Sequence, residues 1–189
     1  MLNRLLLAFC AYALLCSLLF VAYLQNSIKE KQITQTTQTA IIEQMLNQQI
    51  AEERKCLVNA LYYEARSESN LGILAVASVI ENRKNSQVYP STYCKVVNQY
   101  KQFSFTLEDK PDVEMISNTL TAYDKKSYEY ISELSDTMVM GSFETILPKN
   151  VMWYHTKKIK PYWTKSKNIY DTIGAHHFYK QKEKPNAKK

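Results

Sequence analysis

Residues 5–24 form a run of twenty residues without a charged side chain. Twenty residues of α-helix span about 30 Å, the thickness of the hydrocarbon core of a bilayer. Arg4 and the amino terminus precede the run, whereas the charges that follow it at residues 29–31 nearly balance. Because positive charge favours the cytoplasmic side, we expect residues 1–4 in the cytoplasm and the rest of the chain outside. The run therefore predicts a single-pass signal-anchor in the inner membrane that contacts the lipid bilayer.

A cleaved signal peptide is the alternative interpretation of the same run. Its apolar segment would be shorter, and a small-x-small cleavage site would follow it. Ala11-Tyr12-Ala13 has this form but lies in the middle of the run, and Ala22-Tyr23-Leu24 at the exit ends in a large residue. The uncleaved anchor is therefore the favoured interpretation.

The net charge of +6 is concentrated near the carboxyl terminus. Residues 149–189 hold 11 Lys and 2 acids, whereas residues 26–148 hold 12 basic and 16 acidic residues. A basic stretch that is expected outside the cytoplasm does not indicate a nucleic-acid partner. Residues 181–189 are predicted to be a solvated basic tail.

Helical patterns occupy the first part of the exported chain. Residues 25–50 begin as a Thr- and Gln-rich linker or juxtamembrane helix, and apolar residues recur at helical spacing from Ala40 onward. We expect this helix to continue to Arg66. A second helix is predicted over residues 71–84 with Asn70 as its cap, and a third from Pro111 to about Leu134.

Short aromatic or β-branched runs follow Gly141 and predict strands at residues 151–154, 169–170 and 178–179. Pro161 and Gly174 are expected to separate them. Helices first and strands later indicate a small, mainly helical α+β domain over residues 51–180.

The segment from Leu57 to Glu68 has the most informative pattern. On a helix its apolar residues share a broad arc, and Glu64 projects from the edge of that arc. A carboxylate aimed at apolar neighbours is disfavoured in its charged form, so the pKa of Glu64 should rise, as a general acid requires. The alternative is a structural ion pair in which Glu64 or Glu68 contacts an arginine such as Arg66.

Two cysteines, Cys56 and Cys94, lie in the exported part, where a disulfide can persist. Closing that loop would stabilise the fold by about 3–4 kcal/mol in the chain-entropy model. Two buried free thiols are the alternative. Cys10 and Cys16 lie in the apolar run and are expected to be lipid-buried thiols. No C-x-x-C pair is present, so the sequence predicts no structural metal site.

A series of short motifs follows the Glu64 segment in a fixed order. The series comprises Tyr62-Tyr63-Glu64-Ala65-Arg66-Ser67-Glu68, Gly72-Ile73-Leu74-Ala75-Val76-Ala77, Asn82-Arg83, Gln102-Phe103-Ser104-Phe105, Tyr154-His155-Thr156, Pro161-Tyr162-Trp163 and Gly174-Ala175-His176-His177-Phe178-Tyr179. Over residues 56–179 this order resembles the SleB-type cell-wall hydrolases, the family of the spore-cortex-lytic enzyme.

The resemblance implies a lysozyme-like domain that cleaves peptidoglycan glycan strands between N-acetylmuramic acid and N-acetylglucosamine. It implies that Glu64 is the catalytic acid and base of a lytic transglycosylase that forms a 1,6-anhydro product without a cofactor. Glu68 is the candidate for a second catalytic carboxylate; alternatively it orients Arg66 or closes the helix end. Ser67 stands where the family usually has Gly, and Phe105 where it often has Trp.

Substrate contacts are predicted for polar and aromatic residues of these motifs, namely Tyr63, Gln102, Phe103, Ser104, Tyr154, His155, Trp163 and His176. The aromatic residues of short strands, Tyr179 included, fit a hydrophobic core as well as a saccharide groove. With a glutamate, His155, His176 and His177 would resemble the zinc ligands of an amidase, but no H-E-x-x-H spacing is present.

The sequence as a whole predicts a membrane-anchored, peptidoglycan-cleaving enzyme in the periplasm or facing the cell wall. Three alternatives remain: a hydrolysing muramidase acting at the same site, an N-acetylmuramoyl-L-alanine amidase, and a non-catalytic, membrane-anchored wall-binding protein. A phage endolysin and a bacterial remodelling enzyme fit the residues equally well. The sequence indicates no particular oligomeric state.

Overall fold

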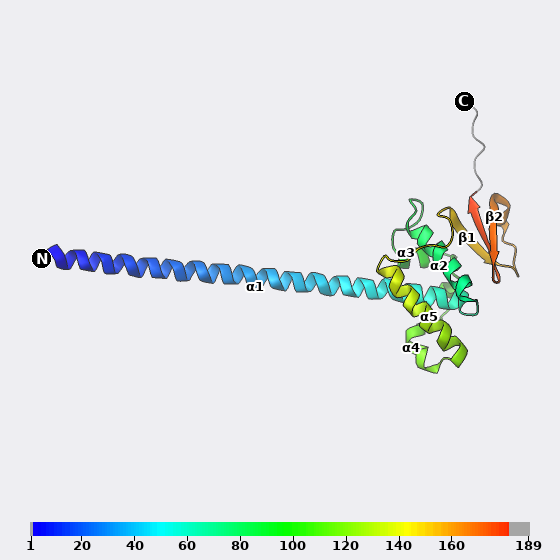
Figure 1. Ribbon diagram of the computed structural model, residues 1–189, viewed down its shortest axis with the longest axis horizontal. Coiled ribbons are helices and arrows are strands. Elements are labelled where there is room, and N and C mark those ends of the chain that lie inside the picture. Colours follow the sequence, from blue (N-terminus) through cyan, green and yellow to red (C-terminus); the bar gives the residue numbers. More distant parts are fainter. Residues whose placement is uncertain (1, 182–189) are drawn as a thin grey trace, which may run out of the picture. The chain divides into compact units, whose positions relative to one another are not determined.

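The computed structural model describes residues 2–181, with the side chains of residues 2–8, 10 and 11 outside that description. Residues 182–189, most of the predicted basic tail, also lie outside the described residues. The chain divides into two units, Met1–Gln48 and Gln49–Lys189. Each unit is described by itself below, and the elements are labelled in Figure 1.

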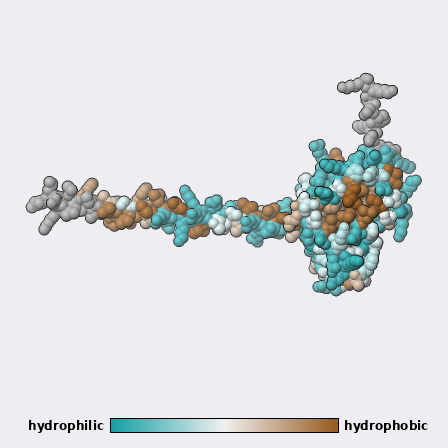
Figure 2. Space-filling view, in the orientation of Figure 1, coloured by the Kyte–Doolittle hydropathy of each residue, from teal (hydrophilic) through white to brown (hydrophobic). Residues whose placement is uncertain are grey.

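The first helix, α1 (Leu2–Ala65), is continuous, because no Gly or Pro interrupts its sequence. Residues 25–50 are therefore helical throughout and form no flexible linker. The hydroxyls of Thr34, Thr36, Thr37 and Thr39 donate to carbonyls one turn earlier, at 2.9–3.0 Å. Figure 2 shows an apolar stretch of α1, then a hydrophilic one, then a second apolar one.

The sequence predicts that residues 5–24 span the membrane as a helix. No helix of that part combines the length and the apolar character that a membrane crossing requires. Positions 5–8, 10 and 11 of the predicted span lie outside the residues whose side chains are described.

The second unit is built around α2 (Asn70–Lys84), whose residues are buried from Gly72 to Arg83 with the exception of Leu74. It contacts α3 (Tyr93–Val97), α5 (Ala122–Val139) and the sheet. The predicted helix is confirmed, but its cap is Ser69 and not Asn70. The Ser69 side chain accepts the Gly72 N–H at 3.3 Å, as an N-cap serine does.

The third predicted helix is interrupted, so the expectation of one helix from Pro111 to about Leu134 is wrong. Its residues form α4 (Val113–Ile116), the 3₁₀ turn η2 (Ser117–Thr119) and α5. Leu120 is extended, and Thr121 begins a new helix by accepting the Asp124 N–H at 3.1 Å. The Thr121 hydroxyl in turn donates to the Asp124 carboxylate at 2.9 Å. The two contacts between Thr121 and Asp124 stabilise the first turn of α5, so a new helix begins within the range predicted for one helix.

Within the described residues, three strands form an antiparallel sheet in the order β1-β3-β2, with β1 at Val151–Thr156, β2 at Lys167–Ile173 and β3 at His176–Gln181. The predicted strands are confirmed and extended. The short 3₁₀ helix η3 (Tyr162–Ser166) follows Pro161 and precedes β2. Gly174 makes the β2–β3 turn with a φ of 57°, a conformation that favours glycine.

The hydrophobic core lies where the last turns of α1 meet α2, α5 and the sheet. Its largest fully buried side chains include Leu57, Leu61, Ile80, Phe103, Met138 and Phe178. Asn82 joins α2 to the segment entering β1, because its side-chain amide donates to the carbonyls of Pro148 and Val151 at 2.9 and 3.0 Å. The predicted mainly helical domain with a few short strands is confirmed.

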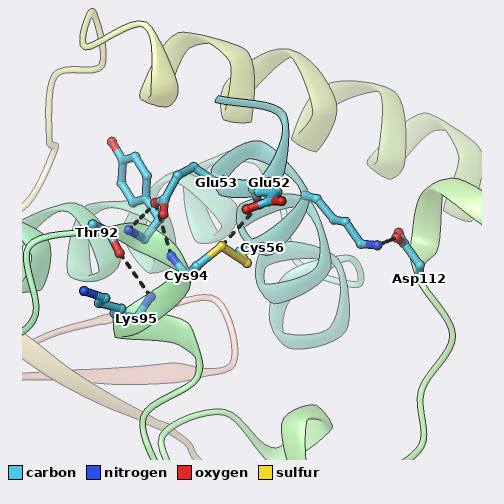
Figure 3. Close-up of a disulfide and its surroundings, with 9 residues drawn as sticks. Glu52, Glu53, Cys56, Thr92, Cys94, Lys95 and Asp112 are labelled. Carbon is cyan, nitrogen blue, oxygen red and sulfur yellow. Dashed lines mark hydrogen bonds and ion pairs between the residues drawn. A yellow bond between two sulfur atoms is a disulfide. The ribbon is translucent and has the colours of Figure 1, made fainter. Parts of the chain in front are cut away.

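A disulfide joins Cys56 of α1 to Cys94 of α3, with 5.2 Å between the two Cα atoms (Figure 3). Of the two alternatives for this pair, the structure therefore has the disulfide. Glu53, one turn before Cys56, accepts the N–H groups of Tyr93 and Cys94 at 2.5 and 3.2 Å. Both contacts fasten the amino-terminal end of α3 to α1.

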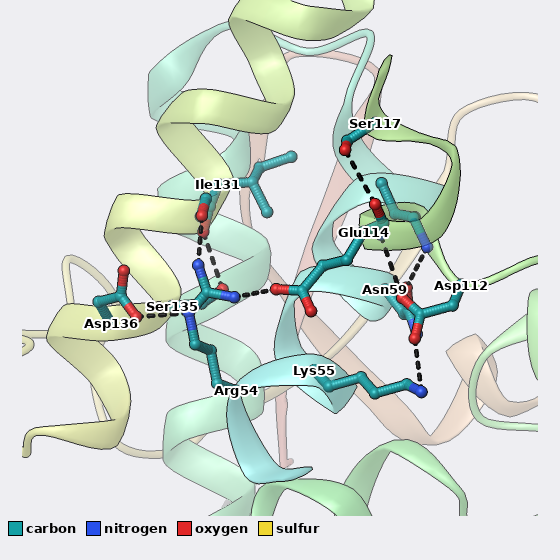
Figure 4. A network of polar contacts seen from close by, with 11 residues as sticks. Arg54, Lys55, Asn59, Asp112, Glu114, Ser117, Ile131, Ser135 and Asp136 are labelled. Carbon is teal, nitrogen blue, oxygen red and sulfur yellow. Dashed lines mark hydrogen bonds and ion pairs between the residues drawn. The ribbon is translucent and has the colours of Figure 1, made fainter. Parts of the chain in front are cut away.

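A polar network holds the same part of α1 against α4 and α5 (Figure 4). Arg54 pairs with Glu114 and Asp136 and donates to Ser132. Asn59 accepts the Val113 N–H at 2.9 Å. Together with the disulfide, these contacts orient the last turns of α1, which carry Glu64.

Candidate active site

A cavity of about 690 Å³ lies in the second unit, at the carboxyl-terminal end of α1 and beside the sheet. Its walls come from α1, α2, the loop around η1 (Ser104–Leu107), β1, the segment leading into η3, and the start of β2 and β3. Seven of the predicted site residues line it: Glu64, together with Gln102, Ser104, Tyr154, His155, Trp163 and His176.

Glu64 occupies the last turn of α1, and its Oε1 accepts the Ser104 N–H at 3.3 Å. Burial raises the pKa of the Glu64 carboxyl above its ordinary value. The Ser104 N–H, the Tyr154 hydroxyl and the positive charge of Arg83 act in the opposite direction on this pKa. Of the described residues that line the cavity, Glu64 alone carries a carboxyl group. The structure therefore places one carboxyl group, with a pKa raised by burial, in the cavity wall.

Glu68 contacts the β2–β3 turn and not Arg66, its partner in the alternative interpretation. Its Oε2 accepts the Ala175 N–H at 3.0 Å, and its Oε1 lies 3.6 Å from His176 Nδ1. Arg66 pairs instead with Asp124 at 3.4 Å and lies over the Tyr62 ring. The predicted ion pair of Arg66 with Glu64 or Glu68 is thus wrong. Glu68 fastens the end of α1 to the β2–β3 turn.

The family's usual glycine position, Ser67, has no left-handed backbone. Among the described non-glycine residues, only Lys101 has a positive φ, of 60°. Lys101 directly precedes the predicted contact residues Gln102 to Ser104 and lines the cavity. The strained residue of the site is therefore in this loop and not at the helix end.

Two of the predicted aromatic contacts do not face the cavity. Phe103 is fully buried in the core, so the prediction that it touches substrate is wrong. Tyr63 stacks on Phe105 with ring centroids 5.2 Å apart, and its hydroxyl donates to the Pro111 carbonyl at 2.5 Å. Neither Tyr63 nor Phe105 is among the residues that line the cavity. This pair supports the loop that carries Ser104.

His155 is held on both sides of its ring. Its Nδ1 faces the Thr156 carbonyl at 2.8 Å and must donate to it, while Nε2 lies 2.9 Å from the Tyr179 hydroxyl. The ring also stacks on Tyr179 and packs edge-on against Trp163. In the part of the chain that the structure describes, no three His, Cys, Asp or Glu side chains are placed to hold a metal ion. The zinc-amidase alternative therefore has no ligand set there.

His176 is buried against Tyr154, with ring centroids 5.4 Å apart. Burial lowers its pKa, and nearby His155 acts in the same direction, whereas Glu68 opposes both. Neither ring nitrogen of His176 has a hydrogen-bond partner within the described chain.

Arg83 is the main site residue that the sequence reasoning missed. The Asn82-Arg83 motif indicates no role for Arg83 by itself. Arg83 is 4% exposed and lines the cavity from α2, and its Nε donates to the Met152 carbonyl at 2.8 Å. The available signal was helical spacing, because Arg83 follows Val76, Val79 and Ile80 by seven, four and three residues and therefore continues the apolar face of the predicted helix.

Trp153, Lys101 and Lys167 also line the cavity without having been predicted as contacts. The Lys167 ammonium lies 4.1 Å from the centre of the Trp153 ring. The cavity thus combines aromatic walls with cationic side chains.

A family model of cell wall hydrolases, Hydrolase_2, matches residues 67–179 of this chain. The chain therefore belongs to this family of enzymes, which act on peptidoglycan. The ordered motifs predicted a cell-wall hydrolase, and the family match confirms that prediction. The matched range begins three residues after Glu64, so the role of Glu64 is argued from the site itself.

Two solved structures are similar to the chain. One is the catalytic domain of the germination-specific lytic transglycosylase SleB from Bacillus anthracis, 24% identical over 68% of this chain and 93% of that chain, with a TM-score of 0.49. The other is the catalytic domain of the Bacillus cereus SleB protein, 25% identical over 68% and 89%, with a TM-score of 0.45. The comparison with curated proteins produced no match.

Proposed function

We propose that the protein cleaves the bond between N-acetylmuramic acid and N-acetylglucosamine in peptidoglycan as a lytic transglycosylase, with Glu64 as its one acid and base. A single observation carries this proposal. Glu64 is the one carboxyl group among the described residues lining the cavity, and burial raises its pKa. A carboxyl group whose pKa is raised by burial holds its proton to higher pH than an exposed one, which suits it to protonating a leaving oxygen.

The reaction needs one proton donor and no water. Glu64 gives its proton to the glycosidic oxygen as the bond from that oxygen to C1 of the muramic sugar breaks. The resulting Glu64 carboxylate takes the proton of the muramic C6 hydroxyl, and the C6 oxygen forms the new bond to C1. The products are a 1,6-anhydromuramic end and a free sugar hydroxyl, and Glu64 has its proton again.

A hydrolysing muramidase is the alternative at the same site. It would need a second carboxylate, about 5–9.5 Å from the first, as nucleophile or water-activating base. Glu68 is the candidate, but it is engaged with the Ala175 N–H and lies beside His176. These contacts support a structural role for Glu68 and favour the single-acid mechanism.

Gln102, Trp153 and Trp163 are the proposed contacts for the sugars on either side of the bond. The Gln102 amide offers donors and an acceptor for hydroxyl and N-acetyl groups. The indole rings offer flat apolar faces to the ring carbons of a sugar.

For location, we propose that residues 5–24 anchor the chain in the inner membrane and that the catalytic domain faces the wall. The uncharged run and the preceding Arg4 support this orientation. The Cys56–Cys94 disulfide is compatible with an oxidising compartment. Membrane fractions washed with alkaline carbonate should retain the full chain, and its release into the wash would contradict the anchor.

The test of the activity is digestion of purified sacculi by the full chain in detergent, with Glu64→Gln as the variant. Wild-type protein should release soluble muropeptides, and Glu64→Gln should reduce this release by about 10²–10⁴-fold. Release of free stem peptides in place of disaccharide units would identify an amidase. Binding to sacculi without release by either protein would leave a wall-binding role.

A further inference from the structure

Buried polar atoms of three side chains meet at the cavity of Glu64, namely Arg83 Nη1, the Tyr154 hydroxyl oxygen and the ring nitrogens of His176. Within the described chain Arg83 Nη1 and His176 Nε2 have no polar partner, whereas the Tyr154 hydroxyl acts on the Glu64 carboxyl and His176 Nδ1 lies 3.6 Å from Glu68 Oε1. Arg83 is 4% exposed and His176 is 2% exposed. Buried polar groups are almost always paired, so this concentration at one cavity indicates a functional requirement.

Arg83 is the most unusual of the three because it carries a charge. Its Nε is bound to the Met152 carbonyl, and its guanidinium lies near the rings of Tyr89 and Phe103, 5.4 and 6.0 Å from their centres. No carboxylate of the described residues forms an ion pair with it. A buried cation without a partner anion destabilises a fold, and strongly perturbed charged groups of this kind cluster at functional sites.

The anion that suits Arg83 appears during the proposed reaction. Glu64 is neutral while it holds its proton and becomes a carboxylate when it has protonated the glycosidic oxygen. Arg83 and Tyr154 line the same cavity as Glu64, and the charge of the one and the hydroxyl of the other both lower the pKa of the Glu64 carboxyl. A preorganised cation and hydroxyl stabilise charge that develops in a site without having to reorient.

Resting on the proposed function, we propose that Arg83 is a positioning residue for Glu64. Its guanidinium, together with the Tyr154 hydroxyl, stabilises the carboxylate that Glu64 becomes after proton transfer and keeps it ready to take the C6 proton. Arg83 need not touch the substrate for this role.

Other groups face the two residues and could contribute to a pH effect. Glu64 is faced by the Ser104 N–H from η1 and the Tyr154 hydroxyl from β1. Arg83 is faced by Tyr89 and Tyr154. Lys101, Lys167 and His176 line the same cavity. Substitutions at Arg83 alone leave all of these groups in place.

The experiment uses Arg83→Gln, which keeps a donor for the Met152 carbonyl, and Arg83→Lys, which keeps the charge. The pKa of the Glu64 carboxyl is measured by ¹³C NMR titration of the full chain in detergent, and kcat and KM are measured on soluble glycan strands. The titration does not require activity, so it decides the inference even if the proposed reaction is wrong. Arg54→Gln is the control, because it removes a guanidinium from ion pairs with Glu114 and Asp136 outside the cavity.

Arg83→Gln should raise the pKa of Glu64 and lower kcat by about 10²-fold with KM within about threefold, in the range found for removing one preorganised donor. Arg83→Lys should bring the pKa of Glu64 and kcat most of the way back to their wild-type values. Arg54→Gln should lower the melting temperature and leave the pKa of Glu64 unchanged.

An unchanged pKa of Glu64 in Arg83→Gln would overturn the inference. An increase in KM at constant kcat would also overturn it, since that result makes Arg83 a substrate anchor. If Arg83→Gln does not fold, Tyr154→Phe carries the test, because it removes the other group that the proposal assigns to the Glu64 carboxylate. Tyr154→Phe should raise the pKa of Glu64 and lower kcat, and a variant identical to wild type in both would contradict the proposal.

Discussion

Glu68 Oε2 accepts the backbone N–H of Ala175 at 3.0 Å, joining the end of α1 to a hairpin turn 107 residues further along the chain. The contact sets where the β2–β3 hairpin lies, and this hairpin carries His176 into the cavity wall. The turn and the helix end are packed so closely that a Cβ atom at Gly174 would lie 1.9 Å from Glu68 Oε2.

This close approach predicts a cost for Gly174→Ala. The added Cβ would displace the Glu68 carboxylate from the Ala175 N–H, and a φ of 57° strains any residue other than glycine. It should lower the free energy of unfolding by about 2–3 kcal/mol. Gly141→Ala is the matched control, because Gly141 has a φ of 74° but no atom within 4 Å of the added Cβ, and it should cost about 1 kcal/mol. Urea unfolding measures the free energy of unfolding of both variants. Equal decreases would show that the contact with Glu68 adds nothing to the cost of Gly174→Ala.

Substitution of Glu68 separates its structural role from a catalytic one. Glu68→Gln keeps an oxygen that can accept the Ala175 N–H, so the hairpin should stay in place and most of the activity on sacculi should remain. Glu68→Ala removes the acceptor and should lower the melting temperature as well as the activity. If Glu68→Gln were as inactive as Glu64→Gln, a second catalytic carboxylate would be required.

Glu64 predicts a stability effect that depends on pH. Its folded-state pKa is raised by burial, so ionising it favours the unfolded chain. The stability that the neutral Glu64 carboxyl contributes is fully present below its pKa in the unfolded chain. It is lost as pH rises through its pKa in the folded protein. Glu64→Gln should therefore raise the melting temperature above the folded pKa and have little effect in acid. Melting curves from acid to alkaline pH test this, and an equal effect at all pH values would contradict the raised pKa.

Activity, like stability, should fall as Glu64 loses its proton. Because Glu64 must hold its proton to start the reaction, kcat/KM should fall as pH rises through the pKa of this carboxyl. The fall should lie at higher pH than for an ordinary glutamate, since burial raises the pKa. A pH profile on soluble glycan strands measures it. A fall that begins at the pKa of an exposed glutamate would argue against a buried acid.

Loss of the disulfide should weaken the second unit. Cys56 and Cys94 are 38 residues apart, and in the chain-entropy model such a loop contributes about 4 kcal/mol. The double variant Cys56→Ser with Cys94→Ser should show this loss in urea unfolding. Cys16→Ser, at an exposed free cysteine, is the control and should leave the transition unchanged.

The sequence was sufficient to predict features that depend on near neighbours along the chain. The helical spacing around Glu64 and the strand runs after Gly141 are local patterns, and both are confirmed. The start of α5 also has a local signal, because Thr121 and Asp124 have capping-box spacing. The helical patterns before and after Thr121 nevertheless predict one continuous helix.

Features that depend on distant segments could not be predicted in the same way. Phe103 and Ser104 are adjacent, yet packing under α2 buries the first side chain completely while the second residue reaches the cavity. The partner of Glu68 is a backbone N–H, which no residue pattern marks. The importance of Arg83 follows from its burial and from the lack of a carboxylate partner among the described residues, and both are tertiary properties.

The central claim, one acid that transfers the glycosidic bond to the C6 hydroxyl without water, is tested most directly by digesting sacculi in H₂¹⁸O and analysing the muropeptides by mass spectrometry. The account predicts 1,6-anhydromuropeptides without ¹⁸O at the cleaved end. Reducing muramic ends that carry ¹⁸O would contradict it, since they would show that water attacks C1 and that a second group activates it.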